Sequence, residues 1–467
     1  MKLEKFIGWT EKAMRFYYYG LAYFLPISIA FAEIFAGGTL FFFFSKRIRL
    51  FLYHFKSNVL SENTSVSKKI LKFFQSLFNI VRPVPSPLNL PIGIFTLVCA
   101  LSILQSNYVK VSIEAFFFKL LQWTYLYFVF LECMKTRKQL KIFTFFLLVS
   151  FFLVSLNGLV QYFLGKDFMF NHPLAGQRAS STFRHPNDFG AYLVLLIPIA
   201  LSFFLYFKDL KAKGNEIQRV NFAIFSLIIL FMIGVLSLGF TYSRGAWISF
   251  TLSMIFLGLI RTKALIACLS IGLIFIGIFS PLLLQKRQTA FLSYNKSEAL
   301  IASQGLAESE GEKKFDFFWL FLRRLNPSGR SESWREAVRI ISDHPFLGTG
   351  LNTYSQEVRH YKIMWGNYAH NCYLQMAAEI GLLGLSAFLW IIWWLFKLAW
   401  ANLRRRKNTD SFEYALLLGS SAGLLGFLFH SSIDTNFYSV QLGNLMWLMM
   451  GVIVVSFLDY PAVDVRS

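Results

Sequence analysis

The stretch "HNCYLQMAAEIGLLGLSAFLWIIWWLFKLAW", residues 370–400, decides the fold class. After His370 and Asn371 the run is apolar to its end, and Glu379 and Lys397 are its only charged residues. About 20 apolar residues in a helix span the hydrocarbon core of a bilayer, which is roughly 30 Å thick. The stretch therefore predicts a membrane-spanning helix with a histidine at its entrance and a carboxylate buried a few turns below.

Similar apolar runs recur along the whole chain. Of its 467 residues, 55% are hydrophobic, 18% are aromatic and only 15% are charged, and the mean hydropathy is +0.50. This composition predicts an all-α, polytopic bundle of 11 or 12 transmembrane helices. The predicted spans are about 16–44, 89–107, 112–133, 142–164, 188–207, 220–241, 245–260, 264–285, 371–398, 412–430 and 436–458.

The first run, 16–44, is too long for one upright helix. Its 29 residues would extend about 43 Å as a helix, and Pro26 and Gly37-Gly38 interrupt it. It forms either one tilted, kinked helix or a hairpin of two short helices. The basic N-terminus, with Lys2 and Lys5, prefers the cytoplasm, which favours the hairpin and 12 spans. No cleavage site of a signal peptide follows it.

The net charge of +21 lies mostly in the loops between the spans. In a soluble protein this charge would suggest nucleic acid, but here the positive-inside rule explains it, so no nucleic acid is expected. The basic loops "KRIRLFLYHFK", "KTRKQLK", "KDLKAKGNEIQR", "RTK" and "RRRK" are placed in the cytoplasm. Alternation then places 165–187, 242–244, 286–370 and 431–435 on the outer side. The chain divides into N-terminal spans (1–285), a long outer loop (286–370) and C-terminal spans (371–467).

The long outer loop contains a predicted amphipathic helix from about 332 to 342. Trp334, Val338 and Ile341 recur at helical spacing, and Ser333 with Glu336 has the spacing of a capping box. His344-Pro345 should end the helix. Its apolar face either packs on the spans or lies in the outer membrane interface.

No pattern of metal ligands or of nucleotide-binding residues is apparent. The four cysteines fall within or beside apolar segments, and their spacing suggests neither disulfides nor zinc. The chain has no HExxH, CxxC, P-loop or Gly-rich fingerprint, which argues against an ATP-driven pump. The cysteines are Cys99, Cys133, Cys268 and Cys372.

Arginines on the predicted outer side are unusual, because positive-inside statistics should deplete them. Arg244 stands out, since it lies between two spans with almost no loop, and a guanidinium offers bidentate donors to phosphate. A snorkelling interface arginine is the alternative. Arg178 and Arg184 lie in another outer loop, and Arg330 is placed just before the amphipathic helix.

The polar residues at the start of 370–400 have simple alternatives to a catalytic role. His370 could be an interfacial histidine, and Asn371 a helix cap. Glu379 lies nine residues further, roughly 13 Å along the helix, so it cannot orient the His370 ring directly. It is expected to pair with an arginine from another span or to polarise a cavity.

Four stretches in this order resemble the O-antigen ligase and O-antigen polymerase family. They are "STFRHPNDFGAYL" (181–193), "YSRGAW" (242–247), "GRSESWREAVRIISDHPFLGTGLNTY" (329–354) and "HNCYLQMAAEIGLLG" (370–384). The resemblance implies a fold like that of C-type glycosyltransferases. It also implies an enzyme that takes a glycan from a polyprenyl-diphosphate carrier, without a metal or other cofactor, at the outer face of the bacterial inner membrane.

The same resemblance implies roles for particular residues. His370 corresponds to the proposed catalytic base, and Arg244, Arg330 and Arg184 correspond to groups that would hold the diphosphate. The supporting residues would be Asn371, Tyr373 and Glu379. This arrangement suits inverting transfer, because neutral histidine can accept the proton of a hydroxyl near pH 7 and fixed guanidinium groups can stabilise a diphosphate leaving group.

The acceptor is left open by the sequence. A ligase would transfer the glycan to the lipid A core, which is the preferred interpretation. A polymerase would use a second lipid-linked glycan, and a protein O-oligosaccharyltransferase would use a Ser or Thr. The partners are therefore the lipid-linked donor, a hydroxyl acceptor on a glycolipid, glycan or protein, and the lipid bilayer. Outside this class, the chain could be a transporter of lipid-linked sugars, in which His370 would be structural.

Overall fold

The computed structural model describes residues 3–55, 66–212, 217–261, 330–361, 368–406 and 411–457, and within these ranges it is helical without a β-strand. The predicted all-α, polytopic membrane fold is confirmed. The predicted span 264–285 and most of the long loop before residue 330 lie outside the described residues. Among the described residues, six helices are long and apolar enough to cross a membrane: α2 (Ile29–His54), α7 (Arg137–Leu164), α8 (Pro186–Ala212), α9 (Ile217–Phe240), α15 (Cys372–Arg405) and α16 (Phe412–His430). Three shorter apolar helices are α4 (Asn89–Leu104), α10 (Arg244–Ile260) and α17 (Val440–Ser456).

The N-terminal run forms the hairpin that its charge distribution favoured. Helix α1 (Leu3–Phe24) packs against α2, and the turn between them contains Pro26. Helix α2 continues well past the apolar run, to His54. A further helix, α3 (Val66–Val81), follows in a region for which the sequence analysis predicted no element. Its residues Leu71, Phe74 and Phe78 are exposed at helical spacing, so α3 is amphipathic.

The predicted span 112–133 is one continuous rod with a local change of pitch. It consists of α5 (Val109–Ala115), the π-helical turn η2 (Phe116–Leu121) and α6 (Gln122–Cys133). A π-helical turn inserts an extra residue into the helix and rotates the side chains that follow. The next helix, α7, begins with a capping box formed by Thr136 and Gln139.

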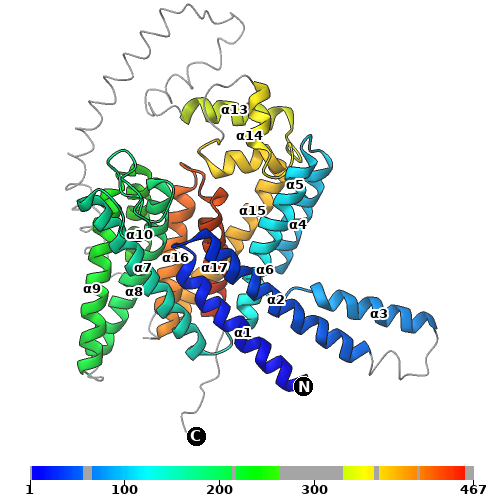
Figure 1. Ribbon diagram of the computed structural model, residues 1–467, viewed down its shortest axis with the longest axis horizontal. Helices are drawn as coiled ribbons and strands as arrows, with labels where there is room; N and C mark the ends of the chain where they lie inside the picture. Colours follow the sequence, from blue (N-terminus) through cyan, green and yellow to red (C-terminus); the bar gives the residue numbers. More distant parts are fainter. Residues whose placement is uncertain are drawn as a thin grey trace, which may run out of the picture.

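The helices are arranged as two halves with the C-terminal helices between them. Figure 1 shows α7 to α10 on one side, α4 to α6 on the other, and α15 to α17 in the middle. Helix α16 packs against α8 and α10, α17 packs against α6, and α15 packs against α4. The contact between α16 and α8 is very close, because a Cβ on Gly423 would collide with the Leu195 carbonyl oxygen. The middle helices therefore contact both halves.

One end of the bundle carries a small cap. It is built from α13 (Arg330–Asp343), α14 (Tyr354–Glu357) and the 3-10 turn η4 (Val358–Tyr361), as Figure 1 shows at the top of the view. We call this the capped end. The apolar face of α13, with Ala337 and Ile340, packs against α14, η4 and Ala378 of α15. Of the two predicted positions for this face, the structure therefore shows packing on the helices.

Two details of the predicted cap helix are corrected. The helix ends at Asp343, before His344-Pro345, as predicted, but it is already helical at Arg330, the first described residue of this segment, rather than from about residue 332. Ser333 lies inside the helix and not at its N-terminus, so the Ser333–Glu336 capping box is wrong. Arg330 is likewise helical and does not precede the helix.

Helix α15 is broken, which the sequence analysis did not foresee. Gly381 has φ 71° and ψ 177°, a conformation open to glycine and costly for other residues. The segment Pro345–Gly350 fills the break. The Leu382 amide donates to the Pro345 carbonyl at 2.8 Å, and the Gly350 amide donates to the Glu379 carbonyl at 2.8 Å. The cap and the helix thus complete each other's backbone hydrogen bonds.

Candidate active site

A single carboxylate organises the capped end. Asp434 lies in the turn after α16, is only 7% exposed, and places Oδ1 3.3 Å from Nδ1 of His370. Its Oδ2 accepts hydrogen bonds from Nδ2 of Asn187 at 2.6 Å and from Nη2 of Arg330 at 3.3 Å. Three segments far apart in sequence therefore meet at one side chain. Two of the predicted site residues, His370 and Arg330, are brought together by it.

Asp434 is held in its charged form. Burial opposes its ionisation, but the hydrogen bond from His370 and the charges of Arg330 and the nearby histidines more than compensate, so the pKa of Asp434 lies well below its ordinary value. A buried carboxylate of this kind needs charged or donor partners to remain stable. Asp434 is consequently an anion across the neutral pH range.

His370 has the geometry of a base with an orienting partner. Its side chain is 41% exposed, and its Nδ1 faces Asp434. With the ring proton on Nδ1, Asp434 accepts it, and Nε2 keeps a lone pair that can take a proton from a bound molecule. The carboxylate would also stabilise the imidazolium ion that results. His370 sits in the left-handed region at φ 50°, a conformation that is uncommon outside glycine.

The backbone around His370 is fixed on both sides. Asn371 caps α15, because its Oδ1 accepts from the amides of Tyr373 and Leu374 at 3.0 and 3.1 Å. The Cys372 amide donates to the Ser431 carbonyl at 2.8 Å, and the Cys372 thiol donates to the Asp434 carbonyl at 3.1 Å. The entrance of α15 is therefore bound to the turn that carries Asp434. The predicted helix cap at Asn371 is confirmed.

Arginines from two other segments surround this pair. Arg178 donates from Nε to the Thr241 carbonyl at 2.7 Å and from Nη2 to Oδ1 of Asn187 at 2.6 Å. Burial lowers the pKa of the Arg178 guanidinium, and so do the neighbouring charges of Arg330 and Arg244, while Asp434 opposes them. Arg244 and Arg330 therefore lie close enough to Arg178 for electrostatic repulsion. Their positive charge exceeds what Asp434 alone can balance.

The two remaining predicted arginines differ in how well the structure ties them to the site. Arg244 is the first residue of α10 and is exposed, and Ser243 before it caps the helix through the Ala246 amide. Arg184 is also exposed, but within the described residues no contact links it to Asp434 or His370. Arg244 thus belongs to the charged cluster because its charge acts on Arg178, whereas Arg184 only lies in the same loop as Arg178.

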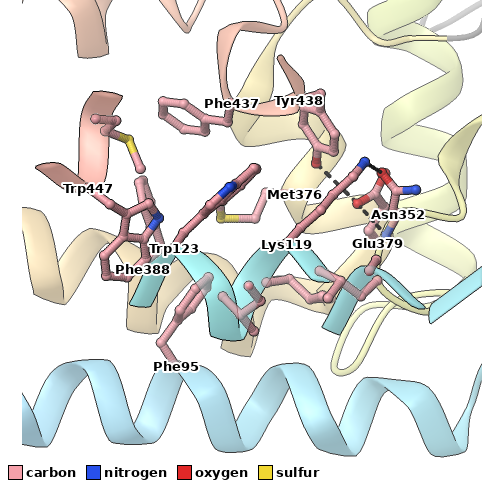
Figure 2. A pocket seen from close by; sticks show the side chains of 15 residues that line it. Phe95, Lys119, Trp123, Asn352, Met376, Glu379, Phe388, Phe437, Tyr438 and Trp447 are labelled. Atoms are coloured by element: carbon pink, nitrogen blue, oxygen red, sulfur yellow. Dashed lines mark hydrogen bonds between the residues drawn. The ribbon is translucent and has the colours of Figure 1, made fainter. Parts of the chain in front are cut away.

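Glu379 has a different role from the one expected for it. It is 1% exposed and accepts hydrogen bonds from the Asn352 and Tyr354 amides, from Gln375 Nε2 and from the Tyr438 hydroxyl, at 2.8 to 3.4 Å (Figure 2). The expected arginine partner is wrong, since these four groups are its hydrogen-bond donors. Glu379 lines a cavity, and its expected role in polarising a cavity stays a prediction.

Tyr373, the other supporting residue, points away from the site. Its hydroxyl donates to the Leu428 carbonyl at 2.8 Å, and its ring packs against Phe388 and Phe437. Tyr373 therefore contributes to the packing of α15 on its neighbours. The three cysteines in the described part of the chain, Cys99, Cys133 and Cys372, are buried and unpaired.

Sequence reasoning missed three members of this cluster. Asp434 lies in the five-residue loop 431–435, and it was not singled out although it is a charged residue between two apolar spans. Arg178 was noted only as one of several outer arginines, and Asn187 was quoted only within a motif. In the described segments, no group of three His, Cys, Asp or Glu side chains is arranged to hold a metal ion.

Comparison with known proteins adds one finding. No curated protein matches the chain significantly. Residues 229–389 match a protein family described as O-antigen ligase. The matched range includes Arg244, Arg330 and His370, and it ends before Asp434. The family indicates glycosyl transfer of the O-antigen ligase type, with a lipid-linked glycan and a glycolipid as the general class of partners. Residues 229–389, about a third of the chain, are thus similar to the O-antigen ligase family, and the membrane-spanning helices agree with this similarity.

Proposed function

We propose that the protein transfers a glycan from a polyprenyl-diphosphate carrier to a hydroxyl group, with His370 as the base. The observation that carries the proposal is the contact between His370 Nδ1 and Asp434 Oδ1, at 3.3 Å, beside three arginines. A base with an orienting carboxylate and a nearby cationic site are what inverting transfer to a diphosphate-activated sugar requires. The match to the O-antigen ligase family supports the same reaction class.

The proposed reaction is a single displacement. Nε2 of His370 accepts the proton of the acceptor hydroxyl as its oxygen forms a bond to the anomeric carbon of the donor sugar. The bond between that carbon and the diphosphate oxygen breaks, and the leaving diphosphate takes the electron pair. Asp434 stabilises the imidazolium formed in this step, and the proton then passes from His370 to the solvent.

The arginines would stabilise the leaving group. Arg330 and Arg244 were expected to do so from the resemblance, and Arg178 is added because it shares Asn187 with Asp434. Guanidinium groups bind diphosphate oxygens through two donors each and remain charged at all relevant pH values. Arg184 is kept as a more peripheral candidate on the same loop. With this cluster in place, the proposed transfer needs no metal ion.

The site would face the outer side of the inner membrane. The opposite end of the bundle carries basic residues in ion pairs, such as Arg137 with Glu413 and Arg261 with Asp209. Loops rich in Lys and Arg face the cytoplasm in most membrane proteins. Helices α8, α10 and α16 run between that basic end and the capped end, so the site lies at the other membrane surface.

The preferred acceptor is the lipid A core, as for an O-antigen ligase. A polymerase or a protein O-oligosaccharyltransferase of the same family would use the same base and the same leaving group. The transporter alternative is disfavoured by the contact between His370 and Asp434, since transport requires no general base. The three enzymatic alternatives differ only in the acceptor, so the acceptor is what the experiment must vary.

A transfer assay with purified protein tests the proposal. The donor is a polyprenyl-diphosphate-linked oligosaccharide, and the acceptors, supplied separately, are lipid A core, a second lipid-linked glycan and a Ser/Thr-rich protein. His370→Ala is compared with His360→Ala, an exposed histidine of the cap that serves as a matched control. We expect transfer to lipid A core, survival of activity in EDTA, and loss of transfer only in His370→Ala.

Other results would change the assignment in defined ways. Transfer to one of the other acceptors would move the protein to that branch of the family. Full activity of His370→Ala would remove His370 as the base. Donor binding without transfer to any of the acceptors would favour the transporter.

A further inference from the structure

A cavity of about 80 Å³ lies between α4, the α5–η2–α6 rod, α15 and α17 (Figure 2). Its wall is almost entirely apolar and rich in aromatic rings. The side chains that define it are Phe95, Trp123, Met376, Phe388, Phe437 and Trp447. Apolar cavities of this type do not hold water well and accept apolar guests. The chemistry of the wall therefore selects a hydrocarbon.

The polar groups of the cavity gather at one end. Figure 2 shows Lys119, Asn352, Glu379 and Tyr438 together there, away from Phe95 and Trp447. Glu379 is already satisfied by its four donors, one of which is Tyr438. The cavity thus has an apolar body and a single polar end.

Lys119 is the unusual group at this end. It lies in the π-helical turn η2, and its Nζ donates to Asn352 Oδ1 at 3.1 Å. Across the described ranges of the chain, Lys119 makes no ion pair. Ionisable residues at membrane depth and π-helical turns both occur preferentially at functional sites. Glu379 at the same end attracts the Lys119 charge, and Lys119 is the group there that can donate to the headgroup region of an anionic lipid.

The cavity and the arginine cluster lie on opposite sides of the middle helices. Arg178 and Arg244 come from the half that contains α7 to α10, while Trp123 and Lys119 come from the half that contains α4 to α6 (Figure 1). His370 lies between them at the entrance of α15. Met376 of the cavity follows on the same helix, six residues later.

The same connecting segment also links the two sites. Asp434 belongs to the turn after α16, and Phe437 and Tyr438, which line the cavity, belong to η5 (Asn436–Tyr438) immediately after it. The Phe437 amide donates to Sγ of the Cys372 thiol at 3.4 Å, and Cys372 follows His370 by two residues. A molecule held in the cavity would therefore approach His370 from the side opposite Arg178 and Arg244.

We propose that this cavity receives a hydrocarbon chain of the lipid-anchored acceptor, with Lys119 facing the anionic end of that lipid. The assignment of this lipid as the acceptor rests on the proposed function, in which the arginines on the other side bind the diphosphate of the donor. Two lipids that enter from opposite sides would meet at His370. The cavity would then select among acceptors by their lipid part.

Photocrosslinking tests the proposal separately from turnover. One probe is lipid A carrying a diazirine in an acyl chain, and the other is a polyprenyl diphosphate carrying a diazirine in its chain. Each is incubated in the dark with the purified full chain, irradiated, and mapped by peptide mass spectrometry. We expect the acyl probe to label the segments containing Trp123 and Met376, and unlabelled lipid A to compete with it.

Variants that fill the cavity provide the second arm. Ala115 is 4% exposed and lines the cavity, whereas Ile113 on the same helix is 42% exposed. Ala115→Phe should remove the labelling and raise KM for lipid A core about tenfold, the loss expected when roughly two methylene groups no longer fit. Ile113→Phe should change neither. If Ala115→Phe does not fold, Leu351→Phe, on a half-buried loop residue of the wall, replaces it.

Each outcome is decisive. Labelling of the cavity by the polyprenyl probe alone would overturn the proposal, because the cavity would then hold the donor. Equal labelling in Ala115→Phe and Ile113→Phe, or none in the wild-type protein, would also overturn it. Specific labelling by the acyl probe without any glycan transfer would support the lipid site while rejecting the proposed function.

Discussion

Asp434 and Glu379 are both buried carboxylates near the capped end, and they differ in what surrounds them. Asp434 is bound by three side chains and by the backbone amide of Thr435, and one of the side chains, His370, is 41% exposed. Glu379 is bound by two backbone amides and by two largely buried side chains. A carboxylate that faces accessible, ionisable side chains can influence a reaction. One that accepts from the backbone mainly fixes the path of the chain.

The largest effect should come from Asp434→Asn. The amide would no longer stabilise an imidazolium or fix the tautomer of His370, so transfer should fall by roughly 10³-fold, within the range for general bases and their orienting partners. The turnover number measured at saturating donor and acceptor tests this. Asp343→Asn, at the end of α13, is the matched control and should remain active.

Asp434→Asn should lose the ionic contribution of Asp434 to stability at neutral pH, but the protein should remain folded. The depressed pKa of Asp434 means that its ionic contribution to stability is present above the unfolded value, near 3.9, and is lost only as the pH falls through the lower folded value. Between pH 5 and 8 this contribution is constant in the wild-type protein. If Asp434→Asn unfolds at pH 7, Asp434 is needed for the fold as Glu379 is, and the contrast between the two carboxylates is lost.

Arg244→Lys should have the next largest effect on turnover. A lysine keeps the charge but offers no planar pair of donors, so a loss of about 10²-fold is expected if the arginine binds the leaving diphosphate. Steady-state kinetics with the lipid-linked donor would show it. Arg339→Lys on the cap helix is the control. Wild-type rates for Arg244→Lys would support the snorkelling interpretation.

Glu379→Ala should lower stability rather than turnover. Four donors would lose their acceptor in a buried site, at a cost of about 3 kcal/mol. Thermal unfolding in detergent measures this cost, and turnover per folded molecule should change far less than in Asp434→Asn. Glu379→Gln, which keeps an accepting oxygen, should lose less stability. A selective loss of turnover in Glu379→Ala would show that both carboxylates act in the reaction.

A third acidic residue gives the smallest predicted effect. Burial raises the pKa of Glu336, on α13, to about 7, although Arg339 opposes the shift. Because this pKa exceeds the unfolded value, near 4.3, Glu336 weakens the cap as the pH rises from about 4 to 7.

Glu336→Gln should therefore strengthen the docking of α13 by about 1 kcal/mol at pH 8, after allowance for solvent screening, and leave it unchanged near pH 4. Hydrogen exchange of α13 amides, compared between variant and wild type at each pH, would reveal this. Identical protection of the two proteins at pH 8 would contradict it.

Sequence reasoning succeeded where the signal is local. Apolar length predicted the membrane helices, charge predicted the N-terminal hairpin, and Asn371 before an apolar run predicted a helix cap. The contacts that the sequence did not predict join residues that are far apart in the chain. Asp434 meets His370 across 64 positions and Asn187 across 247, and no local pattern indicates such contacts.

Backbone partners are equally invisible in a sequence. Glu379 was expected to pair with an arginine because a buried charge needs a counterpart, but two backbone amides and two neutral side chains donate to it instead. Ser333 and Glu336 have the spacing of a capping box, yet the chain is already helical at Arg330, so Ser333 lies inside the helix. The chemistry of a side chain indicates what kind of hydrogen-bond or ionic partner it needs, and the fold determines which group becomes that partner.

The break in α15 has a consequence for how the protein is made. At Glu379–Leu382 the helix lacks its own hydrogen bonds, and Pro345–Gly350 supplies them. Unpaired backbone groups cost several kcal/mol each in a lipid environment. α15 can therefore reach its final form only once Pro345–Gly350 has folded back onto it. Completion of this helix and docking of the cap are thereby coupled during biosynthesis.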